Sequence, residues 1–572
     1  MRIKLEYFIF PLVLWSCGAP KQVAVLPLVI EERDKDSIPK PKPQKIDLYE
    51  EGFENIFGRE LDEAANLSWH IRKLINNHKQ AKNINAFDEV PNSTWFTNRH
   101  AKKPMSRAEL KRGSNRGTGP VMEDSLTIVG AKVMGVSPGF RLKDRRGDLY
   151  FIKFDIKGFP QLNTSAEIMT TKFVYAAGYN TPENYLCRLD PKKLRIAKGV
   201  TALNRWGREA PMTFEFVQTI LDKCEPNPDG TYRVVASKAL PGEPLGPFSF
   251  AGVRKDDPND RIPHHHRREL RGYKVIAAWL NNPDAKGTNT LDVYVTENEN
   301  HFVRHCLLDF GTSLGSSGYG AAGPARGRRG AFDLGNMFKK IITLGLWVEP
   351  WEKENDILSP SVGYFSAKLF QPGDFAFIIP NPAFQKATER DGFWGAKIVM
   401  SFSDQDIRAI VETAEYENSE DEEYIIETLI RRRDKTGRYW YGKVNPLDDF
   451  EFSANPDNHL GLRFRDLAVA AGFEEHTNTA YRYLLEHRGK PLTGYFRSQD
   501  QPFLELNPAI LRKIAEKISE QQNDGFTNNI FSFKIQTRRR ERGKWSKHLK
   551  VYFHYHGDRK KLPEIVAIER EN

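Results

Sequence analysis

The stretch from residue 270 to residue 315 constrains the fold of this chain more than any other. It opens with apolar residues at the spacing of a buried helix, which ends at the polar residues 281–283. A polar loop follows, and then two β-type runs, residues 291–295 and 301–308, joined by a turn-rich segment at 297–300. Because a hairpin returns the chain to its start, we expect the loop before it and the residues after it to be neighbours.

Three polar side chains flank this predicted hairpin. Asp284 and Asn289 lie in the loop before it, and Asp309 begins the Asp-Phe-Gly that follows it. Phosphoryl transfer needs a carboxylate near the attacking hydroxyl and oxygen ligands for Mg²⁺. Mg²⁺ keeps several waters, so few protein ligands suffice. The pattern indicates Asp284 as a general base and Asn289 and Asp309 as metal ligands, although each of these residue types alone also occurs by chance.

The segment from residue 126 to residue 154 has the composition of β-strands. Gly135 and Gly139 bracket a turn between two strands, and Lys153 lies in the last one. The backbone N–H groups of such a turn and a strand lysine are groups that meet nucleotide phosphates. An inward-pointing lysine among apolar residues needs an anionic partner, whereas a solvent-facing lysine on an edge strand is the alternative.

The next segment offers such a partner. A helix is predicted from residue 166 to residue 177, capped by Thr164 and Ser165 and ended by Gly178. Glu167 lies in its first turn. There it either pairs with Lys153 or interacts favourably with the helix dipole.

Taken in order, these features resemble the protein-kinase-like superfamily, in which a D-x4-N precedes a DFG. The resemblance is closest to atypical branches such as the HipA-type, CotH-type and phosphoinositide kinases, and it covers roughly residues 125 to 440. It implies a catalytic role for Lys153 beside Asp284, with ATP and Mg²⁺ as cofactors. It also implies that Glu167 fixes Lys153, and that Gly135 and Gly139 contact the nucleotide.

The resemblance also predicts a hinge and a substrate loop. Residues 241–246 would be the hinge that meets adenine, and the glycine-rich basic residues 311–330 would meet an anionic substrate or the phosphates. A disordered surface loop is the alternative for residues 311–330. Asn282 and Pro283 stand where the protein-kinase loop has His and Arg, so regulation through that arginine is not expected.

Three polar segments allow other interpretations. Residues 88–99 either close over a site or pin an N-terminal extension onto a domain. The triple histidine at 264–266 precedes two arginines, and a charged, solvated helix start is favoured over a metal site because adjacent helical residues point in different directions. Residues 431–434, predicted at a helix end, indicate a structural ion-pair cluster or a phosphate site.

The N-terminus indicates a targeting segment. Residues 1–4 are basic, residues 8–15 are apolar, and Cys17 follows them. This resembles a bacterial lipobox and implies a lipid anchor on Cys17, in the outer membrane or facing the periplasm. A cleaved signal with an incidental cysteine, or a buried N-terminal strand, is the alternative. The charged, proline-rich residues that follow indicate a tether.

Composition narrows the remaining choices. The 572 residues are enough for two or three domains. The net charge of +10 suits an anionic ligand such as a nucleotide but is no nucleic-acid signature, so no nucleic-acid partner is expected. Cys306 is expected in the core, and a disulfide between Cys187 and Cys224 stays open.

We therefore expect an α+β, two-lobed kinase-like fold with a β-rich N-lobe, a helical C-lobe, an N-terminal extension and a small β-rich C-terminal domain. The expected function is an ATP- and Mg²⁺-dependent phosphotransferase acting on an unknown acceptor at the cell envelope. The alternative is a catalytically inactive kinase-like scaffold that binds partners there. The predicted divisions are a signal peptide (1–17), a tether (18–48), a helical extension (49–124), an N-lobe (125–246), a C-lobe (247–445) and a tail domain (446–572).

Overall fold

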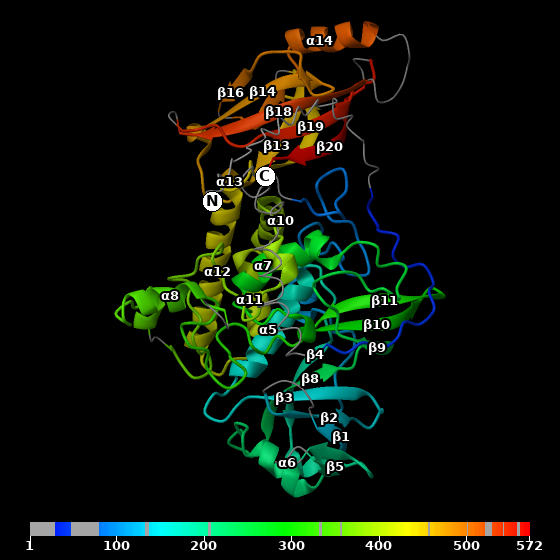
Figure 1. Cartoon of the computed structure of the whole chain (residues 1–572), viewed down its shortest axis with the longest axis vertical. Helices are drawn as coiled ribbons and strands as arrows, with labels where there is room; N and C mark the ends of the chain where they lie inside the picture. The colour runs from blue at the N-terminus through cyan, green and yellow to red at the C-terminus, as the bar shows by residue number, and fades with distance from the viewer. Residues whose placement is uncertain are drawn as a thin grey trace, which may run out of the picture. The chain divides into compact units, whose positions relative to one another are not determined.

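The computed structural model describes residues 29–46, 79–131, 137–203, 208–330, 334–354, 357–455, 458–499, 501–520, 529–540, 543–557 and 561–571. The predicted signal peptide with Cys17, the helix expected over most of 49–82, and Gly135 lie outside these residues. The described chain is a mixed α/β protein with several sheets (Figure 1). It divides into two compact units: Leu447–Asp466 and Glu474–Glu569 belong to unit 1, and Leu28–Pro446, Leu467–Phe473 and Arg570–Asn572 to unit 2.

The first sheet of unit 2 has the strand order β4-β8-β3-β2-β1-β5. Only the β1–β5 pair is parallel. Alternate residues such as Tyr150, Ile152 and Phe154 of β3 pack into a core below one face, where α6 also lies. The strands and helix are β1 (Leu126–Ala131), β2 (Gly139–Lys143), β3 (Leu149–Phe154), β4 (Asn184–Leu189), β5 (Leu194–Ile196), β8 (Tyr232–Lys238) and α6 (Phe214–Leu221).

The predicted helix, loop and hairpin are confirmed. Helix α7 (Arg268–Trp279) precedes β10 (Thr290–Glu297) and β11 (Asn300–Leu307), which pair antiparallel. The two central residues of the hairpin turn, Asn298 and Glu299, have φ of 48° and 69°. Turns with both central φ values positive match the twist of paired strands. Strand β9 (Glu243–Gly246), in the predicted hinge segment, adds to β10 as a third strand.

Helices form the other large part of unit 2. Helix α10 packs against both α7 and α12, and the core between them includes Trp279, Phe402, Ile425 and Leu429. Helices α10 and α11 each start with a reciprocal capping box, which satisfies their first N–H groups. The helices are α4 (Arg107–Arg112), α5 (Leu162–Ala176), α8 (Leu334–Ile342), α9 (Pro382–Gln385), α10 (Glu389–Met400), α11 (Asp404–Val411), α12 (Ser419–Tyr441) and α13 (Leu467–Ala470).

Two predictions about charged segments are wrong. The start of α7 is not solvated, because Arg267, Arg268 and Arg271 are 0–1% exposed and pair with buried carboxylates. Residues 431–434 lie inside α12, not at its end, because the helix continues to Tyr441. The predicted ion pairs are nevertheless present, since Arg431 pairs with Glu427 and Arg433 with Asp404 and Asp434. Residues 88–99 pin the N-terminal segment, since Trp95 and Phe96 are buried in the core of unit 2.

The described residues of unit 1 form two sheets and the helix α14. The larger sheet has the order β15-β14-β18-β19-β20, with β16 beside β14, and its apolar residues form one core with α14. The strands predicted near residues 531–535, 549–554 and 565–568 are present. The elements are β12 (Leu447–Ala454), β13 (Leu460–Asp466), β14 (Thr479–His487), β15 (Lys490–Pro491), β16 (Phe496–Gln499), β17 (Phe503–Glu505), α14 (Pro508–Ser519), β18 (Ile530–Arg539), β19 (Leu549–His554) and β20 (Glu564–Arg570).

Two further observations concern membranes and cysteines. Every helix in the described ranges is too short or too polar to span a membrane. Cys187, Cys224 and Cys306 are free thiols, so the structure contains no bond between Cys187 and Cys224. Cys306 is buried in the core, as predicted.

The short strands β6 (Thr201–Leu203) and β7 (Glu209–Pro211) pair as a separate hairpin.

Candidate nucleotide and phosphotransfer site

Lys153 lies at the centre of the site. It belongs to β3, which has β2 on one side and β8 on the other, so the alternative of an edge-strand lysine is wrong. Its Nζ donates to Glu167 Oε2 and to Asp309 Oδ1, each at 2.8 Å. Burial disfavours the ammonium, but Asp309 and Glu167 outweigh it and raise the pKa of Lys153 above its usual value. The side chain is therefore a fixed cation.

Glu167 reaches Lys153 from α5, which begins earlier than predicted. The helix starts at Leu162, and neither Thr164 nor Ser165 is its cap. Instead, Asp155 accepts hydrogen bonds from Thr164 N at 2.9 Å and from Thr164 Oγ1 at 2.7 Å. Asp155 directly follows β3, so one carboxylate ties the start of α5 to the strand that carries Lys153.

The Glu167 carboxylate is itself held in place. Its side chain is only 2% exposed, and its second oxygen accepts from Asn184 Nδ2 at 3.2 Å. A Cβ added at Gly311 would lie 3.2 Å from Glu167 Oε2, closer than most real Cβ contacts. Glycine after Phe310 thus leaves room for the carboxylate beside Lys153.

Asp309 has an unusual backbone. Its φ is 58°, in the left-handed region that non-glycine residues enter at a cost. The next residue, Phe310, is 1% exposed in the core, and its carbonyl accepts from Ser313 Oγ at 2.7 Å. The Asp309 side chain remains 33% exposed. The surrounding packing therefore fixes a strained residue whose carboxylate still reaches solvent.

Asp284 and Asn289 form a second hydrogen-bonded group. Asn289 Nδ2 donates to Asp284 Oδ2 at 3.0 Å and to the Asp284 carbonyl at 2.8 Å. Leu308 N donates to the Asn289 carbonyl at 2.9 Å, so Asn289 is bonded to the residue directly before Asp309. The structure thus joins the predicted polar residues in two groups that meet where β11 ends.

Gly139 also lies beside the site. It is the first residue of β2, and in the antiparallel register it pairs with Lys153. Residues 311–330, the other glycine-rich segment, are not a disordered surface loop, because Ser313, Leu314 and Ser316 are buried at 0–2% exposure.

Three residues of the site were not predicted from the sequence, namely Lys286, Asn184 and Asp155, whereas Arg326 lies in the predicted basic segment 311–330. Lys286 donates to Asp284 Oδ1 at 2.7 Å, and its position two residues after the predicted base was a usable signal. Burial lowers the pKa of Arg326, and the negative charge of Asp284 opposes this shift. Asn184 and Asp155 act through tertiary contacts, and no local pattern marks them.

The donor set suits Mg²⁺ bound to a nucleotide better than a structural metal. The described ranges contain no group of three or more His, Cys, Asp or Glu side chains that would hold a metal ion. Asp309 and Asn289 offer one carboxylate and one amide oxygen, and Mg²⁺ commonly takes one or two protein ligands with substrate phosphates and water. Lys153 adds a cation for phosphate oxygens.

Comparisons with known proteins add little to the description of this site. No protein-family model matches the chain, and no curated protein matches it. Among solved structures, the crystal structure of a Helicobacter pylori proinflammatory kinase, CtkA, is similar with 12% sequence identity and a TM-score of 0.30. That likeness covers 57% of this chain and 98% of the other. A TM-score this low does not establish a shared fold.

Proposed function

We propose that unit 2 is an ATP- and Mg²⁺-dependent phosphotransferase of the atypical kinase-like type. The sheet of β1–β5 and β8, together with α5, would be its N-lobe, and α7 with α10–α12 would form its C-lobe. The observation that carries the proposal is the bridging position of Lys153, 2.8 Å from both Glu167 and Asp309. A strand lysine joined to a helix glutamate and a DFG aspartate has the geometry required to hold nucleotide phosphates.

Each residue then has a chemical task. Lys153 donates to phosphate oxygens, while Glu167 fixes its ammonium. Asp309 and Asn289 would hold Mg²⁺, which would supply positive charge to the phosphoryl oxygens. Asp284 accepts the proton of the acceptor hydroxyl as that oxygen attacks the terminal phosphorus and ADP leaves.

The contacts of Asp284 support this role. Asn289 Nδ2 orients one of its oxygens at 3.0 Å, and Lys286 Nζ lies 2.7 Å from the other. These two contacts hold the Asp284 side chain in one orientation. The strained backbone of Asp309 supports a functional role too, because such conformations persist where the surroundings fix them and often mark active sites.

The direct test compares nucleotide binding in matched aspartate variants. Asp309→Asn is expected to abolish Mg²⁺-dependent ATP binding, measured by calorimetry and by the ATP-induced shift of the unfolding midpoint. Asp404→Asn, whose carboxylate is 65% exposed on α11, is the control and should bind ATP as the unaltered protein does. Unchanged binding in Asp309→Asn would contradict the proposal. ATP binding without any turnover would instead support the inactive scaffold.

The proposal includes action at a bacterial cell envelope, with the chain anchored by a lipid on Cys17. Support comes from an exposed apolar segment, residues 338–348. Phe338 is 65% exposed, Leu344 90% and Leu346 85%, and Lys339 and Lys340 lie among them. Apolar patches of this kind on soluble proteins commonly mark interaction surfaces, and apolar side chains beside lysines suit a membrane interface.

Vesicle flotation of the full chain tests the membrane association. A single acyl chain gives only reversible binding, so a second contact should add to it. Cys17→Ala is expected to release most of the protein, and Leu344→Asp is expected to weaken the binding that remains. Flotation that neither substitution changes would contradict membrane association through these residues.

A further inference from the structure

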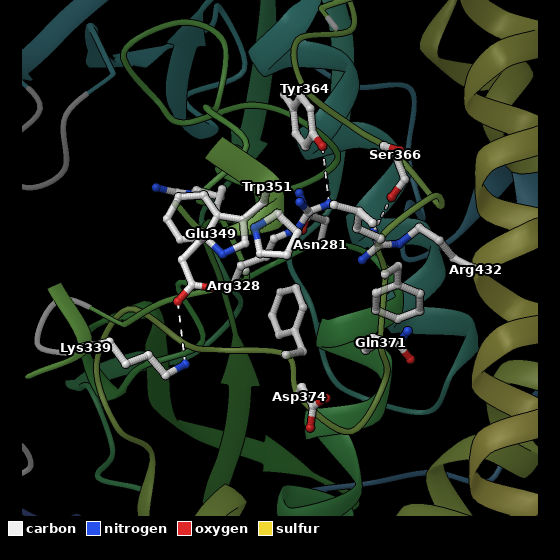
Figure 2. A pocket seen from close by; sticks show the side chains of 16 residues that line it. Asn281, Arg328, Lys339, Glu349, Trp351, Tyr364, Ser366, Gln371, Asp374 and Arg432 are labelled. Atoms are coloured by element: carbon white, nitrogen blue, oxygen red, sulfur yellow. Dashed lines mark hydrogen bonds and ion pairs between the residues drawn. The ribbon is translucent and has the colours of Figure 1, made fainter. Parts of the chain in front are cut away.

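A cavity of about 550 Å³ lies in unit 2, and Figure 2 shows the side chains that line it. Asn281, which follows α7, is part of its wall, and a Cβ at Gly327 would lie 2.9 Å from Asn281 Oδ1. Ile378 N donates to the Pro283 carbonyl at 2.9 Å, so the chain that closes the cavity also contacts the residue before Asp284. The cavity therefore lies near the segment that carries the proposed base, although Asp284 itself is not part of its wall.

The wall of this cavity has more cations than carboxylates. Its charged residues are Arg326, Arg328, Lys339, Arg432, Glu349 and Asp374. Glu349 already lies 3.7 Å from Lys339, a contact drawn as a dashed line in Figure 2. Asp374 acts electrostatically on the buried ammonium of Lys274. The arginines of the wall therefore have too few carboxylates to neutralise them.

Arg432 is the most buried of these cations. It reaches the cavity from α12, and its nitrogens donate to the carbonyls of Ala278, Trp279 and Ser366 at 2.6–2.9 Å. Its guanidinium carbon lies 3.7 Å from the ring centroid of Phe370. Burial, together with the positive charge of Arg328, lowers its pKa to about 9. Arg432 caps the end of α7 and places a positive charge behind the cavity.

Arg328 contributes a buried hydrogen-bond donor to the lining of the cavity. Its Nη2 donates to Tyr364 Oη at 3.2 Å and lies 3.6 Å from Glu354 Oε2. Its Nη1 is buried, and no hydrogen-bond acceptor for it lies within the described part of the chain. Glu354 is shared, because Lys368 Nζ lies 3.3 Å from its other oxygen. An unmade hydrogen bond at a buried donor costs about 1–3 kcal/mol, so this N–H is suited to an anionic ligand.

Aromatic side chains form much of the remaining wall. Trp351, Tyr364, Phe370 and Phe375 line the cavity with the polar side chains of Asn281 and Gln371. Pockets with apolar walls and a few convergent polar groups bind small molecules. Guanidinium groups bind carboxylates and phosphates with two parallel hydrogen bonds.

We propose that this cavity is the acceptor site, and that the acceptor is a small molecule with a carboxylate or phosphate group on a flat apolar body. Arg328 binds the anionic group, Arg432 adds its field from behind, and the acceptor hydroxyl points toward Asp284. Arg326 donates to the Thr312 carbonyl at 3.4 Å and interacts electrostatically with Asp284. It therefore lies between the cavity and Asp284. The assignment of the ligand as the phosphoryl acceptor rests on the proposed phosphotransfer function. The binding of an anion in the cavity does not depend on it.

Calorimetry with phenyl phosphate and inorganic phosphate tests the binding site. Phenyl phosphate combines the two features and is expected to bind more tightly than inorganic phosphate. Arg328→Gln is expected to weaken phenyl phosphate binding about tenfold, the loss of one charge-assisted hydrogen bond. Arg329→Gln, which removes the same charge from the adjacent exposed position, is the matched control and should have no effect.

A second variant guards against a folding defect in Arg328→Gln. Gln371 is an exposed residue of the cavity wall, and Gln371→Glu adds a negative charge there without removing any internal contact of Arg328. This variant is also expected to weaken phenyl phosphate binding. Equal binding by the unaltered protein, Arg328→Gln and Gln371→Glu would overturn the proposal.

Two further measurements separate this inference from the proposed function. In Asp309→Asn, phenyl phosphate binding should persist even though ATP binding is lost. If Lys153→Met abolishes phenyl phosphate binding while Arg328→Gln retains it, the anion sits at the nucleotide site and the cavity proposal is wrong. A phosphotyrosine peptide that binds far more tightly than phenyl phosphate would assign the cavity to a protein side chain and overturn a small-molecule acceptor.

Discussion

Two of the ion-pair networks among the described residues of unit 2 differ in their access to water. In one, Arg268 and Arg271 of α7 share Asp391 of α10 at 3.0 and 3.1 Å, and all three side chains are 0% exposed. In the other, Lys153 joins Glu167 to Asp309, and the Asp309 side chain is 33% exposed. The first network is closed on every side, whereas the second ends in a carboxylate that solvent or a ligand can reach.

The difference separates structural from functional charge. Arg268 Nη1 also donates to Asp88 Oδ1 at 2.6 Å, so the buried network fastens residues 88–99 and α10 to α7. Although burial opposes ionisation, Arg268 and Arg390 lower the pKa of Asp88 well below its usual value. A buried charge that loses its partner is costly. Lys153 and Asp309 lie where a phosphate or a cation can join them.

Breaking the buried network should give the largest effect on stability. Asp391→Ala leaves the guanidinium groups of Arg268 and Arg271 buried without their shared carboxylate. The free energy of unfolding of unit 2 should fall by about 3–5 kcal/mol, measured by denaturant unfolding. ATP binding by the protein that remains folded should not change.

The matched control for Asp391→Ala is an exposed ion pair. Arg408 and Glu423 lie 2.7 Å apart with side chains 45% and 48% exposed. Glu423→Ala should change the free energy of unfolding by less than about 1 kcal/mol. Similar losses in the two variants would show that burial does not distinguish the networks.

Breaking the open network should affect ligand binding more than folding. Lys153→Met is expected to abolish ATP binding and to cost about 1–3 kcal/mol of stability, because Glu167 stays buried without its ammonium. Calorimetry measures ATP binding, and denaturant unfolding measures the loss of stability.

A double variant tells these two effects of Lys153 apart. Lys153→Met with Glu167→Gln should regain most of the lost stability, because the buried carboxylate is gone, and should still fail to bind ATP. Recovery of ATP binding in the double variant would contradict the assigned role of Lys153.

Local patterns predicted the elements that carry the site. The helix before Asp284, the hairpin after Asn289, and the strand of Lys153 all follow from residue periodicity and turn composition. The order of the motifs also anticipated the contact between Lys153 and Glu167, which the structure contains at 2.8 Å.

Long-range contacts could not be predicted from such local sequence patterns. The start of α5 is set by Asp155, which precedes the helix by several residues and caps it from the end of β3. The arginines at 267–271 look like a solvated helix start because charged residues usually are exposed. Their carboxylate partners Asp88 and Asp391 lie more than a hundred residues away in sequence. No window of local sequence contains such pairs.

The buried network also predicts a dependence of stability on acid. Arg271 Nη2 donates to His266 Nδ1 at 2.7 Å, so this histidine must be neutral in the fold. Burial, with the positive charges of His265, Arg271, Lys82 and Lys79, lowers the pKa of His266 to about 4. Between its usual value near 6.5 and about 4, the unfolded chain binds more protons, so the stability of unit 2 falls as pH falls through this window.

Replacing this histidine tests the acid dependence. His266→Gln removes the titrating group, and the unfolding midpoint of unit 2 should then change less between pH 6.5 and pH 4 than in the unaltered protein. His301→Gln, at an exposed position of β11, is the control and should keep the original slope. An unchanged slope in His266→Gln would show that other groups cause the acid sensitivity.

The smallest expected effect comes from Asp155, which ties the start of α5 to the end of β3. Asp155→Ala removes the acceptor for Thr164 N at the start of α5 and should cost about 1 kcal/mol of stability. Thr213→Ala removes the cap of α6, whose Oγ1 accepts from Phe216 N at 3.2 Å, and should cost a similar amount. Only Asp155→Ala should also weaken ATP binding, because α5 carries Glu167 and α6 carries no residue of the site. Equal ATP affinity in the two variants would show that the start of α5 does not position the Lys153–Glu167 pair.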